Sequence, residues 1–245
     1  LSLAAGFTDN ESLPLSEVAK IVEGLAKERM GEKTVLQYGT NQGRPQLREA
    51  ICRRLEGQDE LSAGAYEASS CFITNGSQQA LYLAMQTLCD EGDIVYVEQP
   101  TYFVFLEILD GLGINARPMP MLESGDVDLL SLEADLSGLK EKGELERVKA
   151  LYLVSYFANP SGHSVKEEIK RGIGRLVSKW DASIAIIEDA AYRELFYENP
   201  YPAKGCLAYP EFESLSVLYT STLTKPFATG LKVGYGVCSD ADWLG

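Results

Sequence analysis

Residues 71–89, with the sequence CFITNGSQQALYLAMQTLC, decide the fold class of this chain. The short apolar run at residues 71–74 is typical of a buried strand, and the longer apolar pattern at residues 78–89 is typical of a helix. Only the Asn-Gly-Ser turn at residues 75–77 separates them, so we expect a strand, a tight turn and a helix in immediate succession.

Short strands and helices continue to alternate on both sides of this unit. Helical patterns span residues 16–30 and begin again at Pro45, reaching Leu55; strand-like runs lie at residues 94–97, 150–155, 184–187, 216–220 and 233–237, and further helical patterns at residues 102–109 and 166–179. Continuously apolar strands joined through helices predict an α/β fold, with a mainly parallel sheet sandwiched by helices. Ligands of such sheets bind at the carboxyl ends of the strands.

One motif matches a different kind of ligand site by its residue types alone. Residues 111–116, Gly-Leu-Gly-Ile-Asn-Ala, match the glycine pattern of a dinucleotide-binding turn. The match follows a helical segment and leads toward a strand, which is the reverse of the order that such a turn requires. We interpret these residues as the end of a helix and a turn.

The charge balance argues against two classes of partner. Lys and Arg number 22 against 36 Asp and Glu, so the formal net charge is −14. Nucleic acids and anionic membranes both attract clustered basic residues, and the chain has no such run. No stretch approaches the roughly 20 apolar residues of a spanning helix. We therefore expect neither nucleic acid nor a membrane as a partner.

The cysteines indicate a reducing compartment. They are odd in number, widely spaced and mostly next to apolar residues: Cys52, Cys71, Cys89, Cys206 and Cys238. His163 is the only histidine, so we expect no metal site. No basic region precedes an apolar core at the start of the sequence, so we expect a cytoplasmic location, with a mitochondrial one as the alternative.

Polar or aromatic groups follow nearly every expected strand. Gly76 and Ser77 offer backbone N–H groups and a hydroxyl at a helix start, as a phosphate cradle does, although Ser77 alone reads as an ordinary N-cap. Asp189 ends a buried strand. A carboxylate in that position is as often a helix cap or an ion-pair partner as it is a group that binds a ligand. Taken singly, Tyr102 would be a packing residue and Asn159, in an Asn-Pro pair, a loop residue.

Together with Lys225, these separate residues could form one ligand-binding site. It follows a strand and a Ser/Thr-rich stretch at residues 221–224, at the same edge of the expected sheet. Pyridoxal 5'-phosphate requires a lysine for a Schiff base, an acid for the pyridine nitrogen, a hydroxyl-rich phosphate cup and a residue that stacks on the ring. The sequence therefore predicts this cofactor.

With these residues assembled, the chain resembles the class I/II aminotransferases of the fold-type I pyridoxal phosphate enzymes, over essentially its whole length. It is most similar to the branch holding the 2-aminoadipate and kynurenine aminotransferases and the aminotransferase-like domains of MocR-type regulators. The resemblance is carried, in chain order, by Gln-Tyr-Gly at 37–39, Gly-Arg-Pro-Gln-Leu-Arg at 43–48, Thr-Asn-Gly-Ser-Gln-Gln-Ala at 74–80, Glu-Gln-Pro-Thr-Tyr at 98–102, Asn-Pro-Ser-Gly at 159–162, Glu-Asp-Ala-Ala-Tyr at 188–192 and Thr-Leu-Thr-Lys at 222–225.

The resemblance implies three catalytic residues. Lys225 would hold the cofactor as a Schiff base and, once freed, move the substrate α-proton. Asp189 would keep the pyridine nitrogen protonated, and Tyr102 would stack on the ring. Asn159 and Tyr192 would bind the phenolic oxygen of the ring, and the phosphate would be bound by Gly76, Ser77, Gln78, Thr222, Thr224 and Lys232.

Further roles follow from the same resemblance. Tyr38 would reach the phosphate of a neighbouring subunit, which implies a homodimer, while Gly6 and Asn159 would contact the substrate. Lys232 stands where the family usually has arginine, so it keeps the charge without the bidentate fork. We expect residues 1–38 to form an N-terminal arm and linker helix and residues 39–245 the pyridoxal phosphate-binding large domain.

The function implied is an aminotransferase that moves an amino group from an L-amino acid to a 2-oxo acid by ping-pong chemistry. In the family a C-terminal small domain follows and carries an arginine for the substrate carboxylate; we expect that domain to be absent, and no arginine of this chain takes the role. Two alternatives stay open: a lyase or decarboxylase of the same fold, and a cofactor-binding sensor domain of a transcriptional regulator without turnover. The acidic charge and a start typical of metabolic enzymes favour the enzyme. The donor amino acid stays undetermined.

Overall fold

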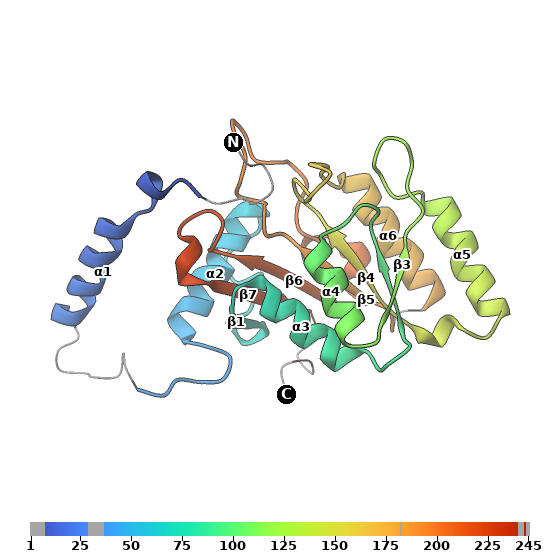
Figure 1. Ribbon diagram of the computed structural model, residues 1–245, viewed down its shortest axis with the longest axis horizontal. Coiled ribbons are helices and arrows are strands. Elements are labelled where there is room, and N and C mark those ends of the chain that lie inside the picture. Colours follow the sequence, from blue (N-terminus) through green and yellow to red (C-terminus); the bar gives the residue numbers. More distant parts are fainter. Residues whose placement is uncertain (1–7, 29–36, 182, 240–242, 244–245) are drawn as a thin grey trace.

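A mixed sheet runs through the centre of the molecule (Figure 1). The computed structural model describes residues 8–28, 37–181, 183–239 and 243. Within these residues the strands lie in the order β1-β7-β6-β5-β4-β2-β3, with bounds Cys71–Asn75 (β1), Ile94–Val97 (β2), Asn115–Pro118 (β3), Val148–Val154 (β4), Ala185–Asp189 (β5), Val217–Thr222 (β6) and Val233–Cys238 (β7).

Most neighbouring strands are parallel, as predicted. Strands β3, β2, β4, β5 and β6 form a parallel block, whereas β7 is antiparallel to both β6 and β1. Only residues 223–232 join β6 to β7, which is too short for the helical crossover that a parallel pair needs. Because β7 reverses direction, β1 runs the same way as β6, so the carboxyl ends of β1, β2, β4, β5 and β6 share one edge.

Helices α2 to α6 cover the sheet, and α1 precedes them along the chain. The bounds of the α-helices are Leu15–Glu28 (α1), Pro45–Gln58 (α2), Ser77–Leu88 (α3), Phe103–Gly111 (α4), Leu129–Glu141 (α5) and Glu167–Trp180 (α6). Apolar residues of α5 and α6 pack with one set of strand side chains, and those of α3 and α4 pack with the other. A third cluster joins α2 to β1, β6 and β7. The predicted sandwich of helices around a sheet is confirmed.

Alternation along β4 places its side chains on the two faces. Leu151 and Leu153 belong to the cluster under α5 and α6, whereas Ala150, Tyr152 and Val154 belong to the cluster under α3 and α4. This is the period of two that a strand imposes on its side chains. Tyr152 therefore lies on the α3/α4 face, which is also the face of Ala185 and Ile187 of β5.

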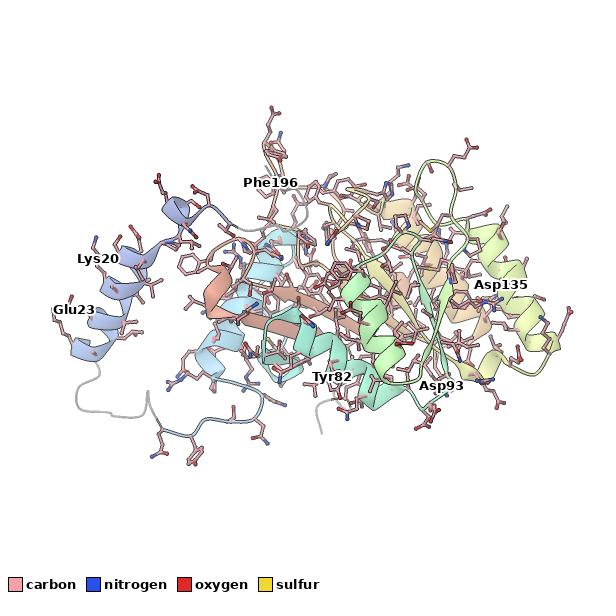
Figure 2. All side chains as sticks on the ribbon, in the orientation of Figure 1. Lys20, Glu23, Tyr82, Asp93, Asp135 and Phe196 are labelled. Carbon is pink, nitrogen blue, oxygen red and sulfur yellow. The ribbon has the colours of Figure 1, made fainter. Side chains whose placement is uncertain are left out.

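Helix α1 lies apart from the sheet (Figure 1), and its polar residues Lys20 and Glu23 are exposed (Figure 2). The expected helix at residues 16–30 is confirmed as far as Glu28, and its last two residues fall outside the described part of the chain. Among the described residues no helix is both long and apolar enough to cross a membrane. In that same part of the chain no group of three or more His, Cys, Asp or Glu could hold a metal ion.

The cysteines are free thiols, as the sequence predicts. Cys52, Cys71, Cys206 and Cys238 are buried, and Cys89 is half-buried. Burial raises the pKa of Cys89 to about 12, so this thiol stays protonated at neutral pH.

Candidate functional site

The turn between β1 and α3 presents the start of a helix to the carboxyl edge of the sheet. Gly76 is the N-cap residue, with φ of 75°, a backbone conformation that favours glycine, and no side chain caps the helix. Ser77 is therefore the first helical residue rather than its cap. The hydroxyl of Thr74 donates to the Gly76 carbonyl at 2.8 Å, which holds the turn in place. Uncapped N–H groups at a helix start suit an anion.

Gly234 of β7 supports this turn from beneath, a role that the sequence did not suggest. A Cβ atom built at Gly234 would lie 2.2 Å from the Gly76 carbonyl carbon and 2.4 Å from the Ser77 nitrogen. The register explains the contact, because Gly234 pairs with both Thr74 of β1 and Thr222 of β6. A glycine inside a strand is itself a signal of close backbone approach.

The last residue of β6 and the segment after it bring two hydroxyls and an amine to the same edge. The Thr222 hydroxyl donates to the Val233 carbonyl of β7 at 3.0 Å and accepts from the Thr224 N–H at 3.0 Å, so its one proton is already used within the protein. The Thr224 hydroxyl oxygen is buried and has no hydrogen-bond partner among the described residues. Buried polar atoms of this kind normally have a partner, so the unpartnered Thr224 hydroxyl indicates a ligand-binding site.

Lys225 lies next to Tyr192 and within electrostatic reach of Asp189. Its side-chain nitrogen is 5.5 Å from the centre of the Tyr192 ring. Lys225 is an exposed residue, as a group that must meet an incoming ligand has to be. The Asn159 amide donates to the Tyr192 hydroxyl at 3.5 Å, so the loop after β4 meets the loop after β5. The structure thus brings Lys225, Tyr192 and Asn159 together.

Asp189 is the last residue of β5 and only 4% exposed. Its Oδ1 accepts from the Ala191 N–H at 3.0 Å, and its Oδ2 accepts from the Tyr152 hydroxyl at 2.9 Å. Burial raises the pKa of Asp189, while these two hydrogen bonds and the positive charge of Lys225 act in the opposite direction. A buried carboxylate with two donors and no ion pair among the described residues suits a cationic ligand group.

Buried ion pairs fix the loop that follows Asp189. Arg193 pairs with Asp59 at 2.5 Å and lies over the Tyr156 ring, 4.8 Å from its centre. On β5 itself, Glu188 pairs with Lys170 of α6 at 2.7 Å, and both side chains are fully buried. Because Arg193 directly follows Tyr192, these contacts hold the Tyr192 backbone in place.

The remaining predicted residues are more scattered. Tyr102 is the N-cap residue of α4 and is half-buried against the α3/α4 cluster. Gln78 is exposed on the first turn of α3. Lys232 is exposed, and its carbonyl oxygen lies 4.0 Å from the position of a Cβ at Gly76, which places its backbone beside the turn.

Tyr38 is 99% exposed and does not join the cluster within this chain. Gly6 lies outside the described residues.

Glu98 is a buried acid at this edge that the sequence analysis did not single out as a site residue. It follows the last residue of β2, and its Oε2 accepts from the Val154 N–H at 2.8 Å, so the side chain continues the β2–β4 ladder. Burial raises the pKa of Glu98 to about 8, and the negative charge of Asp189 contributes to the increase. The Glu98 carboxyl is therefore mostly protonated at neutral pH.

We expect Glu98→Gln to stabilise the protein in a pH-dependent way. Glutamate in the unfolded chain ionises near pH 4.5, whereas folded Glu98 keeps its proton to about pH 8. Between these values the unfolded state binds fewer protons, so wild-type stability falls as pH rises, by up to about 3 kcal/mol at pH 7. Glutamine still accepts from Val154 and does not ionise. Urea unfolding at pH 5 and pH 8 should show a larger advantage of the variant at pH 8; an equal difference at both would contradict the burial of a neutral Glu98.

Comparisons with known proteins identify a family and relatives for this chain. The family model for aminotransferase class I and II matches residues 1–244. The chain is 30% identical over 236 residues to aromatic-amino-acid aminotransferase 1 of Thermococcus litoralis, covering 96% of this chain and 53% of the relative. It is 29% identical to the uncharacterized HTH-type transcriptional regulator YjiR of Escherichia coli, covering 96% and 49%. A kynurenine aminotransferase structure from Pyrococcus horikoshii superposes with a TM-score of 0.85 at 30% identity, covering 99% and 56%. The chain therefore spans about half the length of the relatives it matches.

Proposed function

The chain belongs to the class I and II aminotransferase family, and from that premise we propose that it is the cofactor-binding part of a pyridoxal 5'-phosphate-dependent aminotransferase. One observation carries the proposal. An amine on Lys225, a buried carboxylate on Asp189 and an unpartnered buried hydroxyl on Thr224 meet at one edge of the sheet.

The residues present fit this cofactor. The buried Asp189 carboxylate suits a protonated ring nitrogen, since its two hydrogen bonds come from neutral donors and a cation would offset its burial. The uncapped start of α3 and the Thr224 hydroxyl suit a phosphate. We further propose that Gly76, Ser77, Gln78 and Lys232 contribute to that phosphate site, with Thr222 shaping it through its loop hydrogen bonds.

When bound, pyridoxal 5'-phosphate supplies an electron-accepting ring that stabilises the negative charge left on an amino acid after proton removal. Lys225 would hold the cofactor covalently through its side-chain nitrogen and, when released, move the substrate α-proton. Asp189 would keep its negative charge beside the ring nitrogen. Tyr102 would cover the ring, and Asn159 and Tyr192 would orient its oxygen.

We propose amino acids and 2-oxo acids as substrates and a homodimer as the assembly. Tyr38 supports the second proposal, because a tyrosine that is 99% exposed is available to another subunit. Residues 1–38 would then be an arm and linker helix and residues 39–245 the large domain, with Gly6 near the substrate. The five cysteines form no disulfide among the described residues, which supports a cytoplasmic location.

A second candidate function is a ligand-sensing domain without turnover. It is supported by the regulators of the helix-turn-helix type, such as YjiR, that match 95% or more of this chain. Such a domain would bind the cofactor and an amino acid through the same residues.

A half-reaction separates the two functions. The chain is loaded with pyridoxal 5'-phosphate, mixed with single L-amino acids from dicarboxylic, aromatic and branched classes, and followed by cofactor absorbance and by 2-oxo acid formed. We expect one 2-oxo acid per cofactor with the correct donor. An absorbance change without 2-oxo acid would favour the sensor, and absence of cofactor binding would reject both.

A further inference from the structure

Tyr152 makes the only side-chain hydrogen bond to Asp189 among the described residues, and nothing in its sequence context marks it. It is fully buried in β4, within a run of apolar residues, and its hydroxyl donates to Asp189 Oδ2 at 2.9 Å. The register explains how it reaches Asp189. Val154 lies opposite Asp189, and Tyr152 is two residues earlier on the same face, so its ring extends diagonally across the β4–β5 pair.

Helix α4 fixes the position of this hydroxyl. The Tyr152 ring stacks on Phe105, with ring centres 3.8 Å apart and an interplanar angle of 23°. Phe105 lies in the first turn of α4, three residues after the N-cap residue Tyr102. The helix that would place Tyr102 over the cofactor ring therefore also locks the donor to Asp189.

The charges around this pair keep Tyr152 a donor. Burial raises the pKa of Tyr152 well above its usual value, and the neighbouring Asp189 and Glu98 carboxyls act in the same direction, so the hydroxyl keeps its proton. Lys225, from the segment after β6, favours the ionised form of Asp189, whereas Glu188, its neighbour on β5, disfavours it. Glu98, at the end of β2, is the other acid whose charge interacts with that of Asp189. Tyr152 adds a neutral donor that favours the ionised form without adding a charge.

We propose that Tyr152 is a positioning residue of the cofactor site, which orients the Asp189 carboxylate and keeps it ionised for the ring nitrogen. This inference rests on the proposed function, because it needs a cofactor whose nitrogen meets Asp189. Loss of the hydroxyl leaves Oδ2 without its donor in a buried site, so Asp189 would bind a proton at higher pH and hold the cofactor less tightly.

The test is cofactor affinity as a function of pH in the full chain. We expect Tyr152→Phe to bind pyridoxal 5'-phosphate about 10- to 100-fold more weakly, the range for a hydrogen bond to a charged group. Its affinity should also begin to fall at a higher pH than that of the wild type as the solution is acidified. Tyr156→Phe is the matched control, because Tyr156 is equally buried but its hydroxyl donates to the Ala203 carbonyl at 3.1 Å. Unchanged pH dependence in Tyr156→Phe is expected.

Asp189→Asn distinguishes failure of this inference from failure of the proposed function. If Tyr152 acts through Asp189, Tyr152→Phe should add little to the loss already caused by Asp189→Asn. Full additivity, or a Tyr152→Phe profile like that of Tyr156→Phe, would overturn the role of Tyr152 alone. Unchanged cofactor affinity in Asp189→Asn would overturn the proposed cofactor site itself.

Discussion

Lys225→Ala is expected to abolish the covalent labelling by pyridoxal 5'-phosphate that remains after borohydride reduction. It is also expected to slow transamination by at least about 10²- to 10⁴-fold, the contribution typical of a positioned general acid–base. The reason is that one amine would serve both as the covalent anchor and as the proton carrier. Reduction with borohydride, proteolysis and peptide mapping measure the attachment, and a single-turnover assay measures the rate.

Lys225→Arg provides the control for charge. Arginine keeps a positive charge near Asp189, which lowers the pKa of that carboxyl as Lys225 does, but its guanidinium does not act as the nucleophile. Both variants should therefore lose the label, while the arginine variant should retain more of the non-covalent cofactor affinity. Label on another lysine in the wild type would reject Lys225 as the anchor.

Much of this edge of the sheet could be predicted from sequence, because its residues follow buried strands. The strand that ends at Asp189 is preceded by an apolar run at residues 184–187, and parallel strands of that kind have carboxyl ends that meet at one edge. Lys225, Asn159 and Tyr192 all follow predicted strands, while the roles of Asn159 and Tyr192 are implied by the resemblance to class I/II aminotransferases; the structure brings the three residues together. Local periodicity predicts where these residues lie, and the resemblance implies what they do.

Other features depend on contacts that no local pattern reveals. Strand β3, with the sequence Asn-Ala-Arg-Pro, is an exposed edge strand and lacks the apolar alternation that marks its neighbours, so no range was expected for it. Tyr152 looks like an ordinary core residue, and only the β4–β5 register shows its hydroxyl at Asp189. Glu98 likewise becomes a buried acid only when Val154 is known to lie beside it.

Gly234 shows how a long-range backbone contact can decide the site, and it leads to the second large expected effect. Gly234→Ala should destabilise the protein by about 1 to 3 kcal/mol or more, since the added Cβ would overlap the backbone of Gly76 and Ser77, which cannot rotate away as a side chain can. The turn at the start of α3 would have to move, so affinity for pyridoxal 5'-phosphate should fall as well. Urea unfolding and equilibrium dialysis of the cofactor measure the two effects.

Gly230→Ala is the matched control because it lies in the segment just before β7 and a Cβ there would meet no atom within 4 Å. We expect its stability and cofactor affinity to stay close to those of the wild type. Loss of affinity in Gly234→Ala at conditions where it remains folded would show that β7 holds the turn in its binding shape. Equal behaviour of the two variants would mean that the turn can shift without cost, and the contact between β7 and the start of α3 would then have no part in binding the phosphate.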